Sequence, residues 1–101
     1  MDQKAKQKFR ASKRWKEFRD KIRHEQKVDP ITGSKLTRCA NLHHMDLNSD
    51  NYEDLSDESH FVFLNQASHK TIHYFAHKDW RHRLEVMTKL LERMAEINGW
   101  P

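Results

Sequence analysis

The sequence predicts a small α+β fold, in which a two-stranded antiparallel hairpin and a short helix lie between an N-terminal basic helix and a C-terminal helix. Apolar residues recur at helical spacing towards both ends of the chain, and two short segments between them have the character of strands separated by a polar stretch. We expect one domain over residues 1–101, since a chain of this length can bury only a limited core.

The first element is a helix over residues 12–26. An apolar stripe begins at Trp15 and continues at the third and seventh positions after it, while Lys and Arg occupy the other faces. Ser12 is placed to cap this helix, because its hydroxyl can accept a hydrogen bond from a free backbone N–H. Residues 1–11 would then form a flexible basic arm.

Extended structure is expected in the middle of the chain. The segment Asp29-Pro30-Ile31-Thr32-Gly33 suits a tight turn, so the first helix ends before it and a short hairpin follows. Residues 36–44 show mixed alternation, residues 48–59 form a polar loop, and residues 61–64 are a wholly apolar strand. The two strands are expected to pair with each other.

Two more helices are predicted after the second strand. Ser68 is placed to cap a short helix that completes a strand–strand–helix motif over residues 36–77. Asp79 is placed to cap the last helix, over residues 79–98, and Gly99 ends it. The apolar side of this last helix holds Trp80, Leu84, Met87, Leu91, Met94 and Ile97.

The net charge of +4 is carried by the two ends of the chain. Residues 1–26 contain ten Lys or Arg against four acidic residues, whereas residues 27–66 contain three against seven. A local basic excess favours a polyanionic partner such as nucleic acid, although a solvated helix face would have the same composition. The candidate DNA-binding residues are Lys13, Arg14, Lys16, Arg19, Lys70, Arg81 and Arg83.

Several classes of protein are excluded by composition. The single cysteine, Cys39, rules out an internal disulfide and any zinc site built from several cysteines. No apolar run approaches the roughly 20 residues that span a bilayer, and the N-terminus lacks the apolar core of a signal peptide. We therefore expect a soluble, cytoplasmic protein without a membrane partner.

Histidines indicate a metal site. Five of the eight lie between Leu42 and His73. His69 and His73 are four residues apart, so on a helix they lie about one turn apart on one face, where two imidazoles can hold one cation. His43 and His44 are neighbours on a strand and point to opposite sides. One of them can be a third ligand while the other acts as a base.

These features resemble the HNH endonuclease family, which uses the ββα-metal fold. The resemblance covers about residues 12–77 and rests on three segments, which are Leu42-His43-His44-Met45-Asp46, Phe61-Val62-Phe63-Leu64 and His69-Lys70-Thr71-Ile72-His73. The colicin-like version of the family implies that His43, His69 and His73 are metal ligands and that His44 is the general base.

The resemblance has two departures. The family asparagine that orients the base stands nine residues before the first helix histidine, and here that position is His60. We assign His60 this role, although it could also be a fourth metal ligand. Many members carry a cysteine pair where this chain has Asn65 and Ser68, so no structural four-cysteine zinc is expected.

The implied function is a divalent-metal-dependent DNA endonuclease, which cuts by a one-metal mechanism and leaves 5′-phosphate and 3′-hydroxyl ends. Its ion would be Mg, Mn, Ni or Zn, its intrinsic sequence specificity low, its origin a phage or bacterium, and its place the cytoplasm of the cell. A protein partner such as a phage terminase is compatible with this function. The alternative is a non-catalytic, zinc-stabilised DNA-binding module or a terminase-associated packaging partner.

Overall fold

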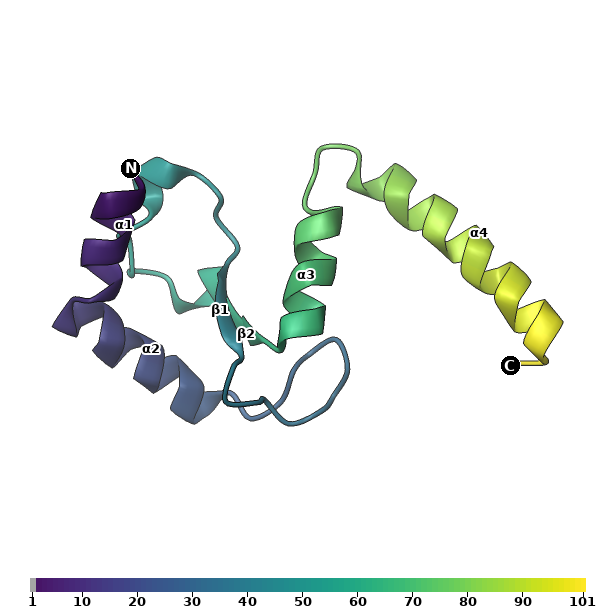
Figure 1. Ribbon diagram of the computed structural model, residues 1–101, viewed down its shortest axis with the longest axis horizontal. Helices are drawn as coiled ribbons and strands as arrows, with labels where there is room; N and C mark the ends of the chain where they lie inside the picture. The colour runs from purple at the N-terminus through teal and green to yellow at the C-terminus, as the bar shows by residue number, and fades with distance from the viewer. Residues whose placement is uncertain (1) are drawn as a thin grey trace. The chain divides into compact units, whose positions relative to one another are not determined.

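The computed structural model describes residues 2–101, so residue 1 of the predicted arm lies outside the description. Its architecture is α+β, with four α-helices and a two-stranded antiparallel hairpin among the described residues (Figure 1). In chain order the elements are α1 (Gln3–Arg10), α2 (Lys13–Glu25), β1 (Asn41–His44), η1 (Ser49–Asn51), η2 (Glu58–His60), β2 (Phe61–Leu64), α3 (Gln66–Phe75) and α4 (Trp80–Asn98). The predicted fold class and the hairpin followed by a helix are confirmed.

The N-terminal segment is helical over Gln3–Arg10, within the stretch for which the sequence predicts a flexible arm. Asp2 caps α1 by accepting a hydrogen bond from the backbone N–H of Ala5 at 2.7 Å. Phe9 at the far end of α1 is only 6% exposed. Burial of a large aromatic side chain stabilises the ordered segment, and Phe9 lies outside the apolar stripe that begins at Trp15.

An aromatic core lies where α1 and α2 meet the hairpin. Ser12 caps α2 as predicted, accepting from the N–H of Trp15 at 3.2 Å. Phe9 and Trp15 have their ring centroids 5.6 Å apart. The core consists of buried Phe9, Trp15 and Phe61, with Phe18, Leu42, Tyr52 and Leu55 packed around them. Ring contacts of this kind stabilise the fold beyond the apolar area that they bury.

The hairpin has two different faces. β1 and β2 pair antiparallel, with His43 opposite Val62 and His44 opposite Phe61. Because side chains alternate along a strand, Leu42 and His44 face the aromatic core while His43 points to the other side. This alternation separates the doubled histidine into two environments.

The free edge of β2 is closed by the side chain of Gln26. Its amide nitrogen donates to the carbonyl of Phe63, and its amide oxygen accepts from the N–H of Phe63, each at 2.7 Å. A neighbouring strand would make the same pair of bonds. Gln26 therefore satisfies the backbone of β2 and ties the end of α2 to the hairpin.

Asp29 joins the predicted turn to the start of α3. Its carboxylate is fully buried, at 0% exposure. One oxygen accepts from the N–H groups of Ile31 and Thr32, at 2.8 and 3.1 Å. The other accepts from the N–H of Asn65 at 2.8 Å, and the hydroxyl of Ser68 also donates to the carboxylate. Burial alone would raise the pKa of Asp29, but these hydrogen bonds outweigh it and the pKa is lowered.

Ser68 is not the N-cap that the sequence suggested. α3 begins two residues earlier, at Gln66, and Ser68 is buried within its first turns. Its hydroxyl bonds to Asp29 instead of to a free N–H of its own helix. Ser68 has the sequence context of an N-cap, but its hydroxyl instead connects α3 to the distant turn that begins at Asp29.

α4 runs over Trp80–Asn98, within the predicted range of 79–98. Gly99 ends the helix in the left-handed region, at a φ of 68°, as a C-terminal glycine commonly does. Asp79 holds the N-cap position, yet its carboxylate contacts Nδ1 of His77 at 2.6 Å and Nε of Arg83 at 2.9 Å rather than a backbone N–H. No residue of α4 is buried.

The chain divides into two compact units, and the division falls inside α3 after His69. We expected one domain over residues 1–101. The first unit contains the aromatic core and the hairpin, and the second contains the rest of α3 and all of α4. Within residues 2–101, no helix combines the length and the apolar character needed to cross a membrane.

Replacing Asp29 with Asn tests the role of the buried carboxylate. Because its folded pKa is lowered, its contribution to stability is complete above about pH 4 and is lost as the pH falls through that lower folded pKa. Asp29→Asn should lower the melting temperature at neutral pH by about 10 °C or more and flatten the acid limb of the stability curve. Thermal melts followed by circular dichroism across this pH range measure both effects.

The matched control is Asp20→Asn. Asp20 lies on α2 with its side chain 73% exposed, so this variant removes an equal charge without breaking buried hydrogen bonds. It should leave the melting temperature within about 2 °C of the parent. An equal decrease in melting temperature in both variants would mean that Asp29 stabilises the fold only through its contribution to the net charge.

Candidate metal centre

Three imidazoles come together, and we call His43, His69 and His73 the histidine cluster. One ring nitrogen from each residue lies within 4.8 Å of the other two. Nitrogens that hold one tetrahedral ion at about 2.1 Å are roughly 3.4 Å apart, so only a small closing movement is needed. The cluster could hold a metal ion, and it contains the pair His69 and His73 whose spacing predicts a metal site.

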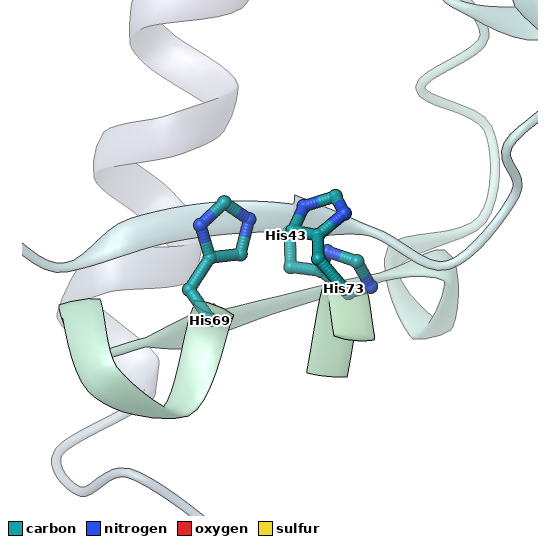
Figure 2. Close-up of side chains that lie close together, drawn as sticks. All are labelled: His43, His69 and His73. Atoms are coloured by element: carbon teal, nitrogen blue, oxygen red, sulfur yellow. The ribbon is translucent and has the colours of Figure 1, made fainter. Parts of the chain in front are cut away.

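Two local geometries build the cluster. Figure 2 shows His43 projecting from β1 and the other two histidines projecting from one side of α3. His69 and His73 are one helical turn apart, and the rings of His43 and His69 meet at 5.4 Å between centroids. His43 is buried, His69 half-buried and His73 exposed. Three histidine ligands would leave a position of a bound ion open, whereas a closed structural site has four protein ligands.

His44 lies on the opposite face of the hairpin and is not brought to the histidine cluster. Its ring is stacked between Tyr52, at 4.9 Å and 10°, and Trp15, at 5.7 Å and 13°. The ring of Phe61 meets it edge-on at 4.7 Å. The predicted base is therefore half-buried inside an aromatic sandwich.

The two ring nitrogens of His44 have different environments. Burial lowers the pKa of His44, and a hydrogen bond to the backbone carbonyl of Tyr52 acts in the opposite direction. Nε2 is buried and has no hydrogen-bond partner, so Nδ1–H is the group that donates to Tyr52. A neutral ring held in this tautomer carries its lone pair on Nε2. A carbonyl of the polar loop thus selects the nitrogen that can accept a proton.

His60 is exposed at the end of η2 and is not part of the histidine cluster. Its Nε2 lies 3.4 Å from a carboxylate oxygen of Asp57, and its carbonyl accepts from the N–H of Met45 at 2.7 Å. Hydrogen bonds from loop residues are the main cause of the lowered pKa values of Asp46, Asp54 and Asp57, and the nearby His60 adds to the effect. The structure thus places His60 among carboxylates rather than beside the cluster as a fourth ligand.

Two of the candidate DNA-binding arginines have structural contacts. Arg14 donates to the carbonyl of Glu53 at 2.8 Å, which ties the polar loop to α2. Arg83 donates to the carbonyl of Tyr74 at 2.6 Å and pairs with Asp79. Replacing either residue would disturb the fold as well as any contact with DNA.

The other candidate cations are more available. Lys13 and Arg19 make exposed ion pairs along α2, with Glu17 at 3.6 Å and Asp20 at 3.4 Å, which contribute little to stability. Arg81 lies over the ring of Trp80 at 4.5 Å. Lys16 and Lys70 are exposed. These are the side chains best able to meet phosphate groups.

Three residues that shape this region were not singled out from the sequence. Asp29 could have been found, because an aspartate before a Pro–Gly turn commonly accepts from the turn's own N–H groups. Gln26 and Tyr52 carried no such signal, since their partners lie on other elements. Their roles follow only from the folded arrangement.

Comparison with known proteins adds no assignment. No family model, curated protein or solved structure matches this chain. The resemblance to the HNH family therefore remains a prediction that rests on the residues themselves.

Removing any member of the histidine cluster should weaken metal binding. His43→Ala, His69→Ala and His73→Ala should each lower the affinity for Zn²⁺ or Ni²⁺ by at least about 100-fold, because a three-ligand site has no spare donor and even indirect partners contribute 10- to 100-fold. Calorimetric titration of the metal-stripped protein measures the change. A bound ion should also raise the melting temperature of the parent.

Two other histidines serve as controls. His24 is exposed on α2, and His60 is the residue that a four-ligand site would require. His24→Ala and His60→Ala should bind the ion as tightly as the parent does. Loss of affinity in His60→Ala would contradict the three-ligand assignment and favour a closed structural site.

Proposed function

We propose that this chain is a divalent-metal-dependent DNA endonuclease of the HNH type, with the histidine cluster as its metal site. The observation that carries the proposal is the meeting of His43, His69 and His73 on a β-hairpin followed by a helix. A bound divalent ion would stabilise the negative charge that develops on the phosphate and on the leaving oxygen. Exposed cations such as Lys13, Lys16 and Arg19 would hold the DNA backbone.

His44 is the proposed general base, acting through Nε2. Its Nδ1–H donates to the carbonyl of Tyr52, so Nε2 is the nitrogen with a lone pair for the proton of the attacking water. Once Nε2 is protonated, the same hydrogen bond stabilises the positive ring. An in-line displacement would leave a 5′-phosphate and a 3′-hydroxyl. Because Nε2 is covered here, the proposal requires the surrounding aromatic side chains to move when DNA binds.

The covered Nε2 favours a second candidate function. If His44 never meets solvent, the histidine cluster would hold a structural zinc in a non-catalytic DNA-binding module or in a packaging partner of a phage terminase. A closed structural site requires four protein ligands, and the cluster offers three. We therefore place the endonuclease first.

The variant His44→Phe separates the two functions. Phenylalanine keeps an aromatic ring between Trp15 and Tyr52 but has no nitrogen to accept a proton. The metal-stripped parent should nick supercoiled plasmid only after Mg²⁺, Mn²⁺, Ni²⁺ or Zn²⁺ is restored. His44→Phe should lower this rate by at least about 100-fold, the range expected for loss of a general base. Gel analysis of nicked plasmid measures the rate.

Metal titration of the same variant provides the control. His44→Phe should bind the ion with parental affinity and stay folded, because the ring packing is retained and the unsatisfied nitrogen is removed together with the hydrogen bond to the Tyr52 carbonyl. Cleavage by His44→Phe at the parental rate would reject His44 as the base. A parent that binds zinc tightly and never nicks DNA would favour the structural module.

The cations of α2 should contribute to DNA affinity without selecting a sequence. Lys13 and Lys16 lie three residues apart, so both can face one phosphate backbone. Each lost phosphate contact should flatten the plot of log affinity against log salt by about 0.9. Lys13→Ala with Lys16→Ala should therefore reduce the slope by up to about 1.8. Fluorescence anisotropy with a labelled duplex at several salt concentrations measures it.

Lys27 and Lys35 form the matched control pair. Both are exposed lysines outside the predicted DNA-binding set. Their replacement by Ala removes the same charge and should leave the slope closer to that of the parent. Equal changes in the two double variants would mean that only net charge matters, and that α2 is a solvated packing helix.

A further inference from the structure

α1 carries the largest excess of positive charge among the four α-helices of the described chain. Its eight residues contain four Lys or Arg and no acidic residue, whereas the thirteen residues of α2 contain six against three. Three cations of α2 make ion pairs, with Glu17, Asp20 and Glu58. Across residues 2–101, no ion pair involves a cation of α1. The four cations of α1 are Lys4, Lys6, Lys8 and Arg10.

The cations of α1 repel one another. Lys4 and Lys8 are four residues apart, which places like charges about one turn apart on the same side of the helix. The same spacing separates Lys6 from Arg10. Pairs of this kind destabilise a helix, and Lys4 also lies in the first turn, where the helix dipole disfavours a positive charge. A bound polyanion would relieve this repulsion, so the charge pattern favours a ligand over a solvated face.

α1 lies on the side of the hairpin that holds His44. The rings of Phe9 and Tyr52 meet with their centroids 5.8 Å apart, and Nζ of Lys6 lies 5.0 Å from the centroid of the Tyr52 ring. The Tyr52 ring is itself stacked on the ring of His44 at 4.9 Å. A polyanion held by α1 would therefore lie beside the proposed base.

We propose that α1 binds the phosphate backbone of the DNA substrate through Lys4, Lys8 and Arg10, and that it holds this backbone next to the proposed base. These three side chains are exposed, so they can meet phosphate groups without a change of fold. The inference rests on the proposed function for the choice of DNA as the polyanion. It adds to the DNA-binding set a helix that the sequence predicted as a flexible arm.

A nucleic acid fits α1 better than an anionic membrane does. A helix that lies in the membrane interface buries an apolar face among the lipids. The one large apolar residue of α1 is Phe9, which is buried in the aromatic core. The exposed residues of α1 are all polar or charged, so only contacts with phosphate groups remain. Such contacts position the DNA backbone and carry no direct sequence information.

The salt dependence of DNA binding by the full chain tests the proposal. Fluorescence anisotropy with a labelled duplex measures the affinity, and a chelator keeps the DNA uncut. One variant combines Lys4→Gln, Lys8→Gln and Arg10→Gln. It should flatten the plot of log affinity against log salt by up to about 2.7, because each lost phosphate contact contributes about 0.9. Glutamine has nearly the helix propensity of Lys and Arg, so circular dichroism should show parental helix content.

The matched control combines Lys27→Gln, Lys35→Gln and Arg38→Gln. These residues are exposed and lie outside the helices, and the variant also loses two Lys and one Arg. It should change the slope by less than one contact, about 0.9. Equal slopes in the two triple variants would mean that only net charge matters and would overturn the proposal, as would a parental slope in the α1 variant.

Vesicles of phosphatidylglycerol and phosphatidylcholine provide a second comparison. The parent should bind them more weakly than it binds duplex DNA at the same salt concentration, because α1 has no exposed apolar face to insert. Vesicle binding as tight as DNA binding, and lost in the α1 variant, would assign α1 to a membrane and overturn the proposal.

Plasmid nicking separates this inference from the proposed function. With the divalent ion restored, the α1 variant should need at least about tenfold more plasmid for half-maximal nicking, because its affinity for DNA is lower. A parent that nicks plasmid, together with a parental salt slope in the α1 variant, would overturn this inference alone. A parent that binds DNA through α1 but never nicks it would support the contact and reject the endonuclease.

Discussion

The buried carboxylate of Asp29 is the contact on which the candidate site depends. It accepts hydrogen bonds from its own turn and from the N–H of Asn65, which stands between β2 and α3. α3 starts at the next residue and carries His69 in its first turn. The start of α3, which carries His69, is therefore held by a residue far from it in the sequence. Because the carboxylate is buried and ionised, it is stable only with all its donors in place, which makes the geometry specific.

The hairpin register is the second constraint. A slip of one residue would turn His43 into the aromatic core and bring His44 to the side of α3, because side chains alternate on a strand. Gln26 opposes such a slip at the edge of β2 through its paired bonds to Phe63. The bond between Met45 and the carbonyl of His60 extends the pairing beyond the strands at the loop end. Two adjacent histidines can hold different roles only while this register is kept.

Sequence periodicity predicted those elements whose evidence is local. The stripe from Trp15, the apolar strand at 61–64 and the helical spacing of His69 and His73 each follow from neighbouring residues. The same local reasoning found His69 and His73, and it left His43 and His44 as alternatives for the third member, of which the resemblance to the HNH family favours His43. It also predicted that neighbours on β1 would face opposite sides.

The features that could not be predicted from the sequence depend on contacts between residues that are distant along the chain. Phe9 is the one buried residue of α1, so no repeat marked it as an anchor. Ser68 has the local sequence pattern of an N-cap, but its hydroxyl donates a hydrogen bond to the carboxylate of Asp29. The exposed position of His60 could not be read from its spacing to His69, because spacing along the chain does not say which way a loop side chain points.

The environment of His44 bears on why a histidine stands inside this core. Between Trp15 and Tyr52 a phenylalanine would fill similar space without an unsatisfied ring nitrogen, at the loss of the bond to the Tyr52 carbonyl, whereas His44 leaves Nε2 unsatisfied. A buried nitrogen without a hydrogen-bond partner lowers the stability of the fold, and the packing of the ring does not compensate for this loss. A proton-accepting role on contact with substrate would explain the cost, because the same stacking that buries the ring also holds its orientation. The aromatic core thus stabilises the fold, and under the proposed function it would also hold the orientation of the base.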